Sequence, residues 1–234
     1  MKTIHKRDLV TGEIFHILNR GVDKRKIFLT DKDYFRFIHN LFEFNDVRPA
    51  FNLGRSFEKS QLIDLRNRTI KPRGLIVEIL AFCLMPNHFH LLMRQKKDNG
   101  ITNFMRKLSV GYANYFNQKY ERTGALFQGR YKAVLVNKES HFVHLPYYIH
   151  LNPFDLVESD WRVGKIKNYQ KAIKFLESYR WSSHLDYIGQ KNFPSVTQRE
   201  FLLTFWGGSE NYRKEIMNWL KEMDLTEMKG LILE

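Results

Sequence analysis

Two histidines, His88 and His90, stand two residues apart in the apolar stretch 88–93 (HFHLLM). In a strand, side chains at this spacing point to the same face, whereas Phe89 and Leu91 point to the other face. On a helix the two imidazoles would be about 200° apart and could not share a ligand. If the stretch is a strand, the pair can bind one metal ion. The alternative is a pair of histidines with a purely structural role.

Tyr148 and Asn152 are four residues apart in a segment that predicts a helix beginning near Ser140. This spacing places both side chains on the same side of the helix, one turn apart. A tyrosine phenol, with a pKa of about 10, needs a neighbouring cation or base before it can act as a nucleophile. Tyr147 points about 100° away and is expected to pack in the core. Without further context, a tyrosine is more often a core or surface residue than a catalytic one.

The composition indicates a folded protein with a polyanionic partner. Of 234 residues, 43% are hydrophobic and 15% aromatic, which is typical of a globular domain. Lys and Arg total 38 against 25 Asp and Glu, giving a formal charge of +13. Such a charge favours nucleic acid through neutralisation of phosphates, although a merely soluble basic protein is the alternative. Because Cys83 is the only cysteine, an intrachain disulfide and a thiolate-rich zinc site are excluded.

The N-terminal residues 1–7 (MKTIHKR) lack the apolar core of a signal peptide. No apolar run approaches the roughly 20 residues that span a bilayer. We therefore expect a cytoplasmic protein that does not engage a membrane.

The order of predicted elements indicates one α+β domain. Strands are predicted at 13–19, 75–85, 88–93 and 131–136, and helices at 30–42, 101–115 and from 140 onward. Thr30 and Asp33 resemble a capping box for the first helix. The resulting order of strand, helix, strand, strand, helix, strand and helix fits a ferredoxin-like sandwich, with helices on one face of an antiparallel sheet.

Residues 85–93 (MPNHFHLLM) resemble the His-hydrophobic-His signature of the HUH endonuclease superfamily, specifically the REP-associated, single-tyrosine transposases. Other strings of this kind occur in the family's order between residue 13 and about residue 190. They are Asn19-Arg-Gly with Arg25 and Ile27-Phe28, Asp33-Tyr34, residues 129–132 (GRYK), residues 148–153 (YIHLNP) and residues 181–184 (WSSH). Phe154-Asp155 departs from the family pattern, in which a small apolar and a basic residue more often follow Asn-Pro.

The resemblance implies a catalytic domain at 1–190 in which His88 and His90 hold a divalent metal and Tyr148 attacks a DNA phosphate. Asn152 stands where related enzymes place a polar third ligand. Two imidazoles and an amide oxygen would suit Mg²⁺ or Mn²⁺. The implied activity is that of a single-stranded DNA endonuclease and strand transferase, acting at hairpin-associated sites through a 5′-phosphotyrosine.

Candidate DNA-binding residues are Arg130, Lys132 and Tyr131, together with Arg20 at the end of the first strand. These residue types contact phosphates and stack on unpaired bases, which favours single-stranded or hairpin DNA as the partner. A basic insertion is predicted at 51–74 and a helical C-terminal extension at 191–234. A monomer is expected in preference to a homodimer.

Three alternatives remain open from the sequence. The first is a metal-dependent phosphodiesterase in which water is the nucleophile. The second is a hairpin DNA-binding protein that does not cut. The third is an RNA-binding module on the same scaffold, since fold does not fix function.

Overall fold

The computed structural model describes residues 9–48, 73–158 and 160–222. Its centre is an antiparallel sheet of four strands in the order β2-β3-β1-β4. The strands are β1 (Ile14–Arg20), β2 (Val77–Met85), β3 (His88–Gln95) and β4 (Lys132–Leu135). Helix α1 (Asp31–Glu43) follows β1, and α3 (Gly100–Lys119) follows β3. This connectivity and strand order are those of a ferredoxin-like sandwich, so the predicted α+β fold is confirmed.

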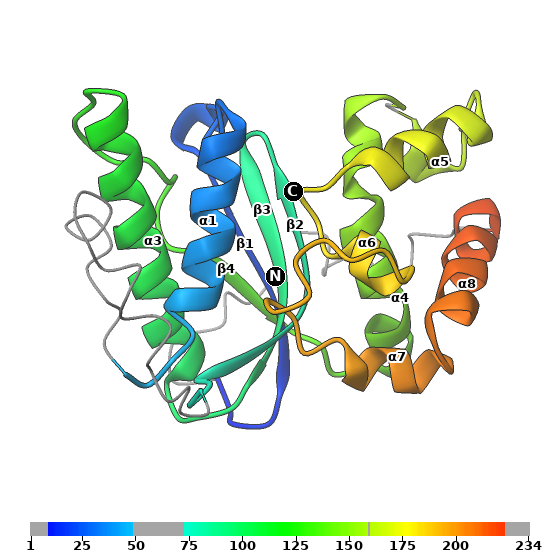
Figure 1. Ribbon diagram of the computed structural model, residues 1–234, viewed down its shortest axis with the longest axis horizontal. Coiled ribbons are helices and arrows are strands. Elements are labelled where there is room, and N and C mark those ends of the chain that lie inside the picture. The colour runs from blue at the N-terminus through cyan, green and yellow to red at the C-terminus, as the bar shows by residue number, and fades with distance from the viewer. Residues whose placement is uncertain (1–8, 49–72, 159, 223–234) are drawn as a thin grey trace, which may run out of the picture.

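Helices cover both faces of the sheet, not one face as predicted. Helices α1 and α3 lie on one side, where the Phe37 ring of α1 packs 4.9 Å from that of Phe89. Helix α4 (Glu139–Leu151) lies on the other side, toward which His90 points (Figure 1). Consecutive residues of β1 and β3 are buried, so both faces of the sheet are covered. An antiparallel sheet with one face open to water would bury only every second residue.

The remaining elements lie mainly on the α4 side of the sheet (Figure 1). They are the 3-10 turns η2 (Val22–Lys24), η3 (Asn152–Leu156) and η4 (Trp161–Val163), and the helices α5 (Tyr169–Ser178), α6 (His184–Tyr187), α7 (Glu200–Trp206) and α8 (Ser209–Glu222). Among the described residues, no helix is long and apolar enough to cross a membrane.

Helices α7 and α8 fall in the segment predicted as a helical extension, and α8 packs on α4 through Tyr212, whose ring lies 5.8 Å from that of Tyr147. A domain boundary near residue 190 stays a prediction. The predicted basic insertion at 51–74 lies outside the described residues except for Arg73 and Gly74.

The free edge of β2 is covered by residues 181–183. The Leu84 amide donates to the Trp181 carbonyl at 2.9 Å, and the Ser183 amide donates to the Phe82 carbonyl at 3.0 Å. An exposed edge strand is a template for unwanted pairing, and this segment occupies it. The string WSSH therefore has a structural role at the sheet edge.

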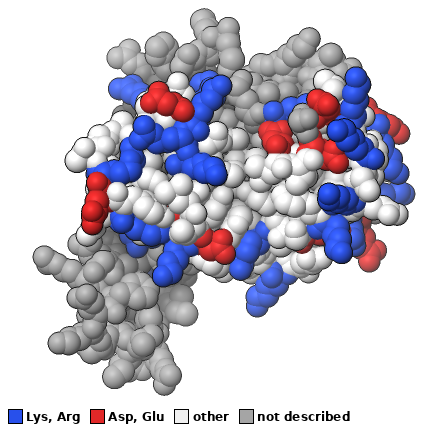
Figure 2. Space-filling view, turned by 90° about the horizontal axis from the view of Figure 1, so that it is seen from above, with Lys and Arg blue, Asp and Glu red and all other residues white. Residues whose placement is uncertain are grey.

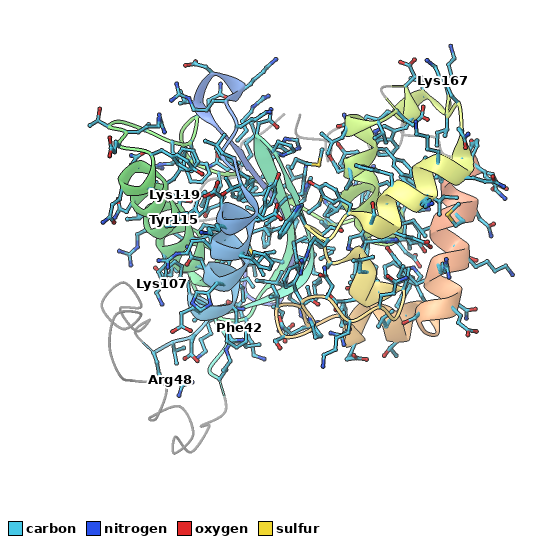
Figure 3. All side chains as sticks on the ribbon, turned by 45° about the horizontal axis from the view of Figure 1, so that its top comes forward. Phe42, Arg48, Lys107, Tyr115, Lys119 and Lys167 are labelled. Atoms are coloured by element: carbon cyan, nitrogen blue, oxygen red, sulfur yellow. The ribbon has the colours of Figure 1, made fainter. Side chains whose placement is uncertain are left out.

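Asp33 joins α1 to α3 through a buried carboxylate. It completes the predicted capping box with Thr30 and also accepts hydrogen bonds from Lys119, at 2.6 Å, and from the Tyr115 and Tyr120 hydroxyls. Figure 3 shows Lys119 and Tyr115 on the part of α3 that lies beside α1. The two helices on this face are thus held together by a charged group as well as by apolar packing.

Candidate active site

His88 and His90 lie on β3 with their side chains on the same face, as the strand prediction required. Their ring centroids are 5.0 Å apart and their planes are at 84°. His88 is opposite Arg20 of β1, and His90 is opposite Leu18. Because directly paired residues of antiparallel strands point to the same face, Arg20 belongs to the same surface as the two histidines.

Tyr148 reaches this surface from α4. Its ring centroid lies 6.0 Å from that of His90, with the ring planes perpendicular. The Trp161 ring stacks on Tyr148 with a centroid distance of 6.2 Å, and the Arg162 guanidinium lies 5.5 Å from the centroid of the Tyr148 ring. The tyrosine is 0% exposed. The fold therefore brings the expected nucleophile to the histidine pair, in a conformation that shields it from solvent.

A buried polar network holds α4 in this position. The two ring nitrogens of His150 contact the Tyr212 hydroxyl at 2.7 Å and the Ser183 hydroxyl at 2.6 Å. His184 also contacts the Tyr212 hydroxyl, at 3.1 Å. Burial lowers the pKa of His150 well below its usual value and that of His184 to about 3, so both imidazoles are neutral. The network links the helix that carries Tyr148 to the β2 edge and to α8.

The donor set of the two histidines fits a divalent metal. His88 Nδ1 lies 2.7 Å from the Asn87 side-chain oxygen, while the Asn87 amide nitrogen donates to the Lys24 carbonyl. Because an amide oxygen only accepts, Nδ1 of His88 carries the proton and Nε2 carries the lone pair. His90 Nδ1 is likewise engaged, at 2.9 Å from His16 Nε2. Metal-binding histidines commonly use one ring nitrogen for such a hydrogen bond and the other for the metal.

Asn152, the predicted third ligand, is fully buried at the start of η3. Its amide nitrogen donates to the Tyr148 carbonyl, and its side-chain oxygen accepts from Arg162 at 3.3 Å. Arg162 is also paired with Asp155 at 2.7 Å. Within the described ranges, no three His, Cys, Asp or Glu side chains form a metal-binding group.

The turn after β1 is locked to the turn between β2 and β3. The Gly21 amide donates to the Asn87 carbonyl at 2.8 Å, and the Ile27 and Phe28 amides both donate to the Pro86 carbonyl. A Cβ at Gly21 would lie 2.2 Å from the Arg25 carbonyl oxygen, so only glycine fits there. Two strings that are far apart in the sequence, 19–28 and 85–88, thus build one edge of the site.

Two hollows lie near the end of β1, and His88 lines one of them. One, of about 200 Å³, is lined by Leu18, Asn19, Arg20, Gln128, Arg130 and Lys132. The other, of about 270 Å³, is lined by Leu18, Arg20, Lys24, Asn87 and His88. Figure 2 looks onto the end of the molecule where β1 ends, and blue side chains predominate over red ones on that face. Arg20 is shared by both hollows, which makes a continuous basic surface next to His88.

Three of the four predicted DNA-binding residues, Arg20, Arg130 and Lys132, therefore come together around one hollow. Tyr131 lies away from these three residues, and its hydroxyl is 3.4 Å from the Thr102 hydroxyl on α3. Alternation along the strand explains the difference, since Tyr131 and Lys132 point to opposite faces of the sheet.

Sequence reasoning did not single out His16, Asn87, Trp161 or Arg162 as parts of the site. A signal for His16 was present, because it is separated by an even number of residues from Arg20 and so shares its strand face. Asn87 was interpreted only as a turn residue. For Trp161 and Arg162 the sequence held no signal, since they reach Tyr148 through an irregular connection after α4.

Residues 68–152 match the family model of IS200-like transposases. This segment carries His88, His90, Tyr148 and Asn152, so all four residues of the candidate site lie in the part of the chain that is similar to this family. No curated protein sequence is significantly similar to the chain. One solved structure, of a REP-associated tyrosine transposase bound to a REP hairpin, is similar with 14% sequence identity and a TM-score of 0.49, covering 83% of this chain and 90% of that chain.

Proposed function

We propose that this protein is a metal-dependent transposase that nicks single-stranded DNA and joins strands through a covalent bond to Tyr148. The family match supports a transposase that cleaves DNA. The observation that carries the proposal further is the contact between the Tyr148 and His90 rings, 6.0 Å apart between centroids. A tyrosine far from the histidines would have no part in phosphate chemistry there.

In the proposed reaction, the Tyr148 oxygen attacks the scissile phosphorus as the phenol loses its proton. A tyrosine-phosphorus ester forms, the bond from phosphorus to the 3′ oxygen breaks, and that oxygen leaves as a protonated 3′-hydroxyl. The DNA end retains a 5′-phosphotyrosine, so a second 3′-hydroxyl can reverse the step and join strands without ATP.

His88 and His90 would hold Mg²⁺ or Mn²⁺ through Nε2, since Nδ1 of each is engaged within the protein. When bound, the ion polarises the phosphate and so lowers the barrier to attack. Asn152 is the proposed third ligand. Its side-chain oxygen would have to give up the hydrogen bond that it accepts from Arg162 in order to bind the ion. The buried ring of Tyr148 must also become accessible, which requires the Trp161-Arg162 turn to move aside.

The DNA strand would lie across the two basic hollows, where Arg20, Arg130 and Lys132 neutralise phosphates. Lys24 in the second hollow extends this row toward His88. Single-stranded or hairpin DNA is the proposed substrate, because the backbone of an unpaired strand can follow a positively charged groove. The protein is proposed to act as a monomer, which light scattering after size-exclusion chromatography would test.

The decisive experiment incubates labelled hairpin DNA bearing single-stranded flanks with Mg²⁺ or Mn²⁺ and resolves the products on denaturing protein gels. Wild type should give a labelled protein band that requires metal. Tyr148→Phe and His88→Ala should give none. Tyr147→Phe is the matched control, because this neighbouring tyrosine packs against Trp206 and Tyr212 and should leave the band unchanged.

Other outcomes would identify another function. Cleavage that persists in Tyr148→Phe would replace the covalent mechanism with hydrolysis by water. Binding of hairpins without cleavage by wild type, with or without metal, would indicate a protein that only recognises DNA.

A further inference from the structure

His16 lies on β1, the strand paired with the one that carries the histidine pair, and the proposed reaction gives it no role. It is fully buried, as is His90. Its Nε2 lies 2.9 Å from Nδ1 of His90, and the two rings are nearly parallel, with a centroid distance of 5.1 Å and an angle of 17°. His16 is therefore in direct polar contact with a proposed metal ligand. It contacts Nδ1 of His90, whereas the nitrogen proposed to bind the metal is Nε2 of His90.

A hydrogen bond between two imidazole nitrogens requires one N–H group and one lone pair. A histidine that binds a metal through Nε2 must be neutral, with its proton on Nδ1. If His90 is such a ligand, its Nδ1–H is the donor and Nε2 of His16 is the acceptor. His16 then carries its own proton on Nδ1.

We propose that His16 is a positioning residue that accepts the Nδ1 proton of His90 and so presents Nε2 of His90 to the divalent metal. The proposal rests on the proposed metal-dependent function. It assigns to His16 the task that the Asn87 side-chain oxygen performs for His88, at 2.7 Å. Each histidine of the pair thus has its own acceptor, one an amide and the other an imidazole.

The consequence of losing His16 follows from burial. Both rings are 0% exposed, so water does not readily replace the lost acceptor. His90 would then rotate or place its proton on Nε2, and either change weakens a metal site. Loss of such an outer partner typically costs about 10–100-fold in metal affinity.

The test compares His16→Phe, which fills the space without an acceptor, with His16→Gln, whose carbonyl oxygen can reach a similar position and accept. Binding of Mn²⁺ to DNA-free protein is measured by electron paramagnetic resonance of the unbound ion. His16→Phe should lower the affinity by about 10–100-fold, and His16→Gln should retain affinity within a few-fold. Circular dichroism melting verifies that both variants fold.

A second readout does not depend on metal. Long-range ¹H–¹⁵N spectra of the metal-free protein with ¹⁵N-labelled histidine report which nitrogen of His90 is protonated, with His90→Asn used for assignment. Wild type should show the proton on Nδ1, and His16→Phe should shift this tautomer while His16→Gln preserves it.

The proposal is overturned if wild-type His90 carries its proton on Nε2, whether or not either variant folds. It is also overturned if His16→Phe keeps both the wild-type Mn²⁺ affinity and the wild-type tautomer. Failure of wild type to bind Mn²⁺ at all would instead refute the metal-dependent function, and the spectra would still decide the contact between His16 and His90.

Discussion

The ring of Tyr148 lies between His90, with which it makes an edge contact at 6.0 Å, and Trp161, which stacks on it at 6.2 Å. The two neighbours belong to different parts of the fold, since His90 is on the central sheet and Trp161 is in a short 3-10 turn. Access to Tyr148 is therefore expected to depend on the turn and not on the sheet.

This arrangement predicts that Tyr148 is protected from chemical modification until DNA binds. In the free protein, nitration with tetranitromethane should modify Tyr148 much more slowly than Tyr169, which is partly exposed on α5. Addition of single-stranded DNA should accelerate nitration of Tyr148 or convert it to the covalent adduct, and peptide mass spectrometry would detect either. Equal nitration of the two tyrosines in free protein would contradict the closed conformation.

The shared position of Arg20 in both hollows predicts a measurable electrostatic contribution to DNA binding. Arg20→Ala should weaken binding of single-stranded DNA about tenfold, because a hydrogen bond to a charged group is worth about 1.5 kcal/mol or more. The slope of log affinity against log salt should fall by about 0.7 for the lost phosphate contact. Fluorescence anisotropy over a salt series measures both quantities.

The control for this experiment is Lys214→Ala, which removes an exposed cation of α8, on the far side of α4 from the sheet (Figure 1). It should leave both the affinity and the slope near the wild-type values. If the two variants weaken binding equally, the basic hollows have no special role.

The hydrogen bond from His88 to Asn87 predicts that an acceptor at position 87 supports metal binding. Asn87→Ala should weaken Mn²⁺ binding by about tenfold or more, because His88 loses the partner that keeps its proton on Nδ1. Asn87→Asp retains an acceptor at this position and should bind Mn²⁺ clearly more tightly than Asn87→Ala. Isothermal titration calorimetry on DNA-free protein would measure this order, and an inverted order would refute the assigned proton position.

The buried carboxylate of Asp33 is expected to stabilise the folded protein, and this stabilisation should be lost in acid. Burial alone would raise the pKa of its carboxyl group, but hydrogen bonds from Lys119, Tyr120 and two backbone amides outweigh burial and lower the pKa to about 2. Since this value lies below the usual 3.8, the carboxylate stabilises the folded state above about pH 4. The contribution is lost progressively as the pH falls from about 4 to about 2.

Asp33→Asn should therefore lower the free energy of unfolding by about 1–3 kcal/mol at pH 7 and reduce its decline between pH 4 and pH 2. Asp31→Asn, at an exposed position in the same helical turn, is the control and should change stability little at pH 7. Urea unfolding at several pH values measures both variants. A decline in Asp33→Asn as steep as in wild type would place the acid-sensitive group elsewhere.

The sequence by itself determined the sheet and the face of the histidine pair. His88 and His90 share a face because side chains alternate along any strand, whatever surrounds it. The order of strands and helices also indicated the sandwich, because short connections between neighbouring elements leave few topologies. The four-residue spacing of Tyr148 and Asn152 likewise follows from helix geometry alone.

Only the tertiary structure decided which residues complete the site. His16 contacts His90 because β1 pairs with β3 in one particular register, and a shift of one residue would turn it to the opposite face. Trp161 and Arg162 reach Tyr148 by way of an irregular segment, for which no periodicity exists to be read. The placement of helices on both faces was missed for a similar reason, because the strand pattern records that a residue is buried but not which element buries it.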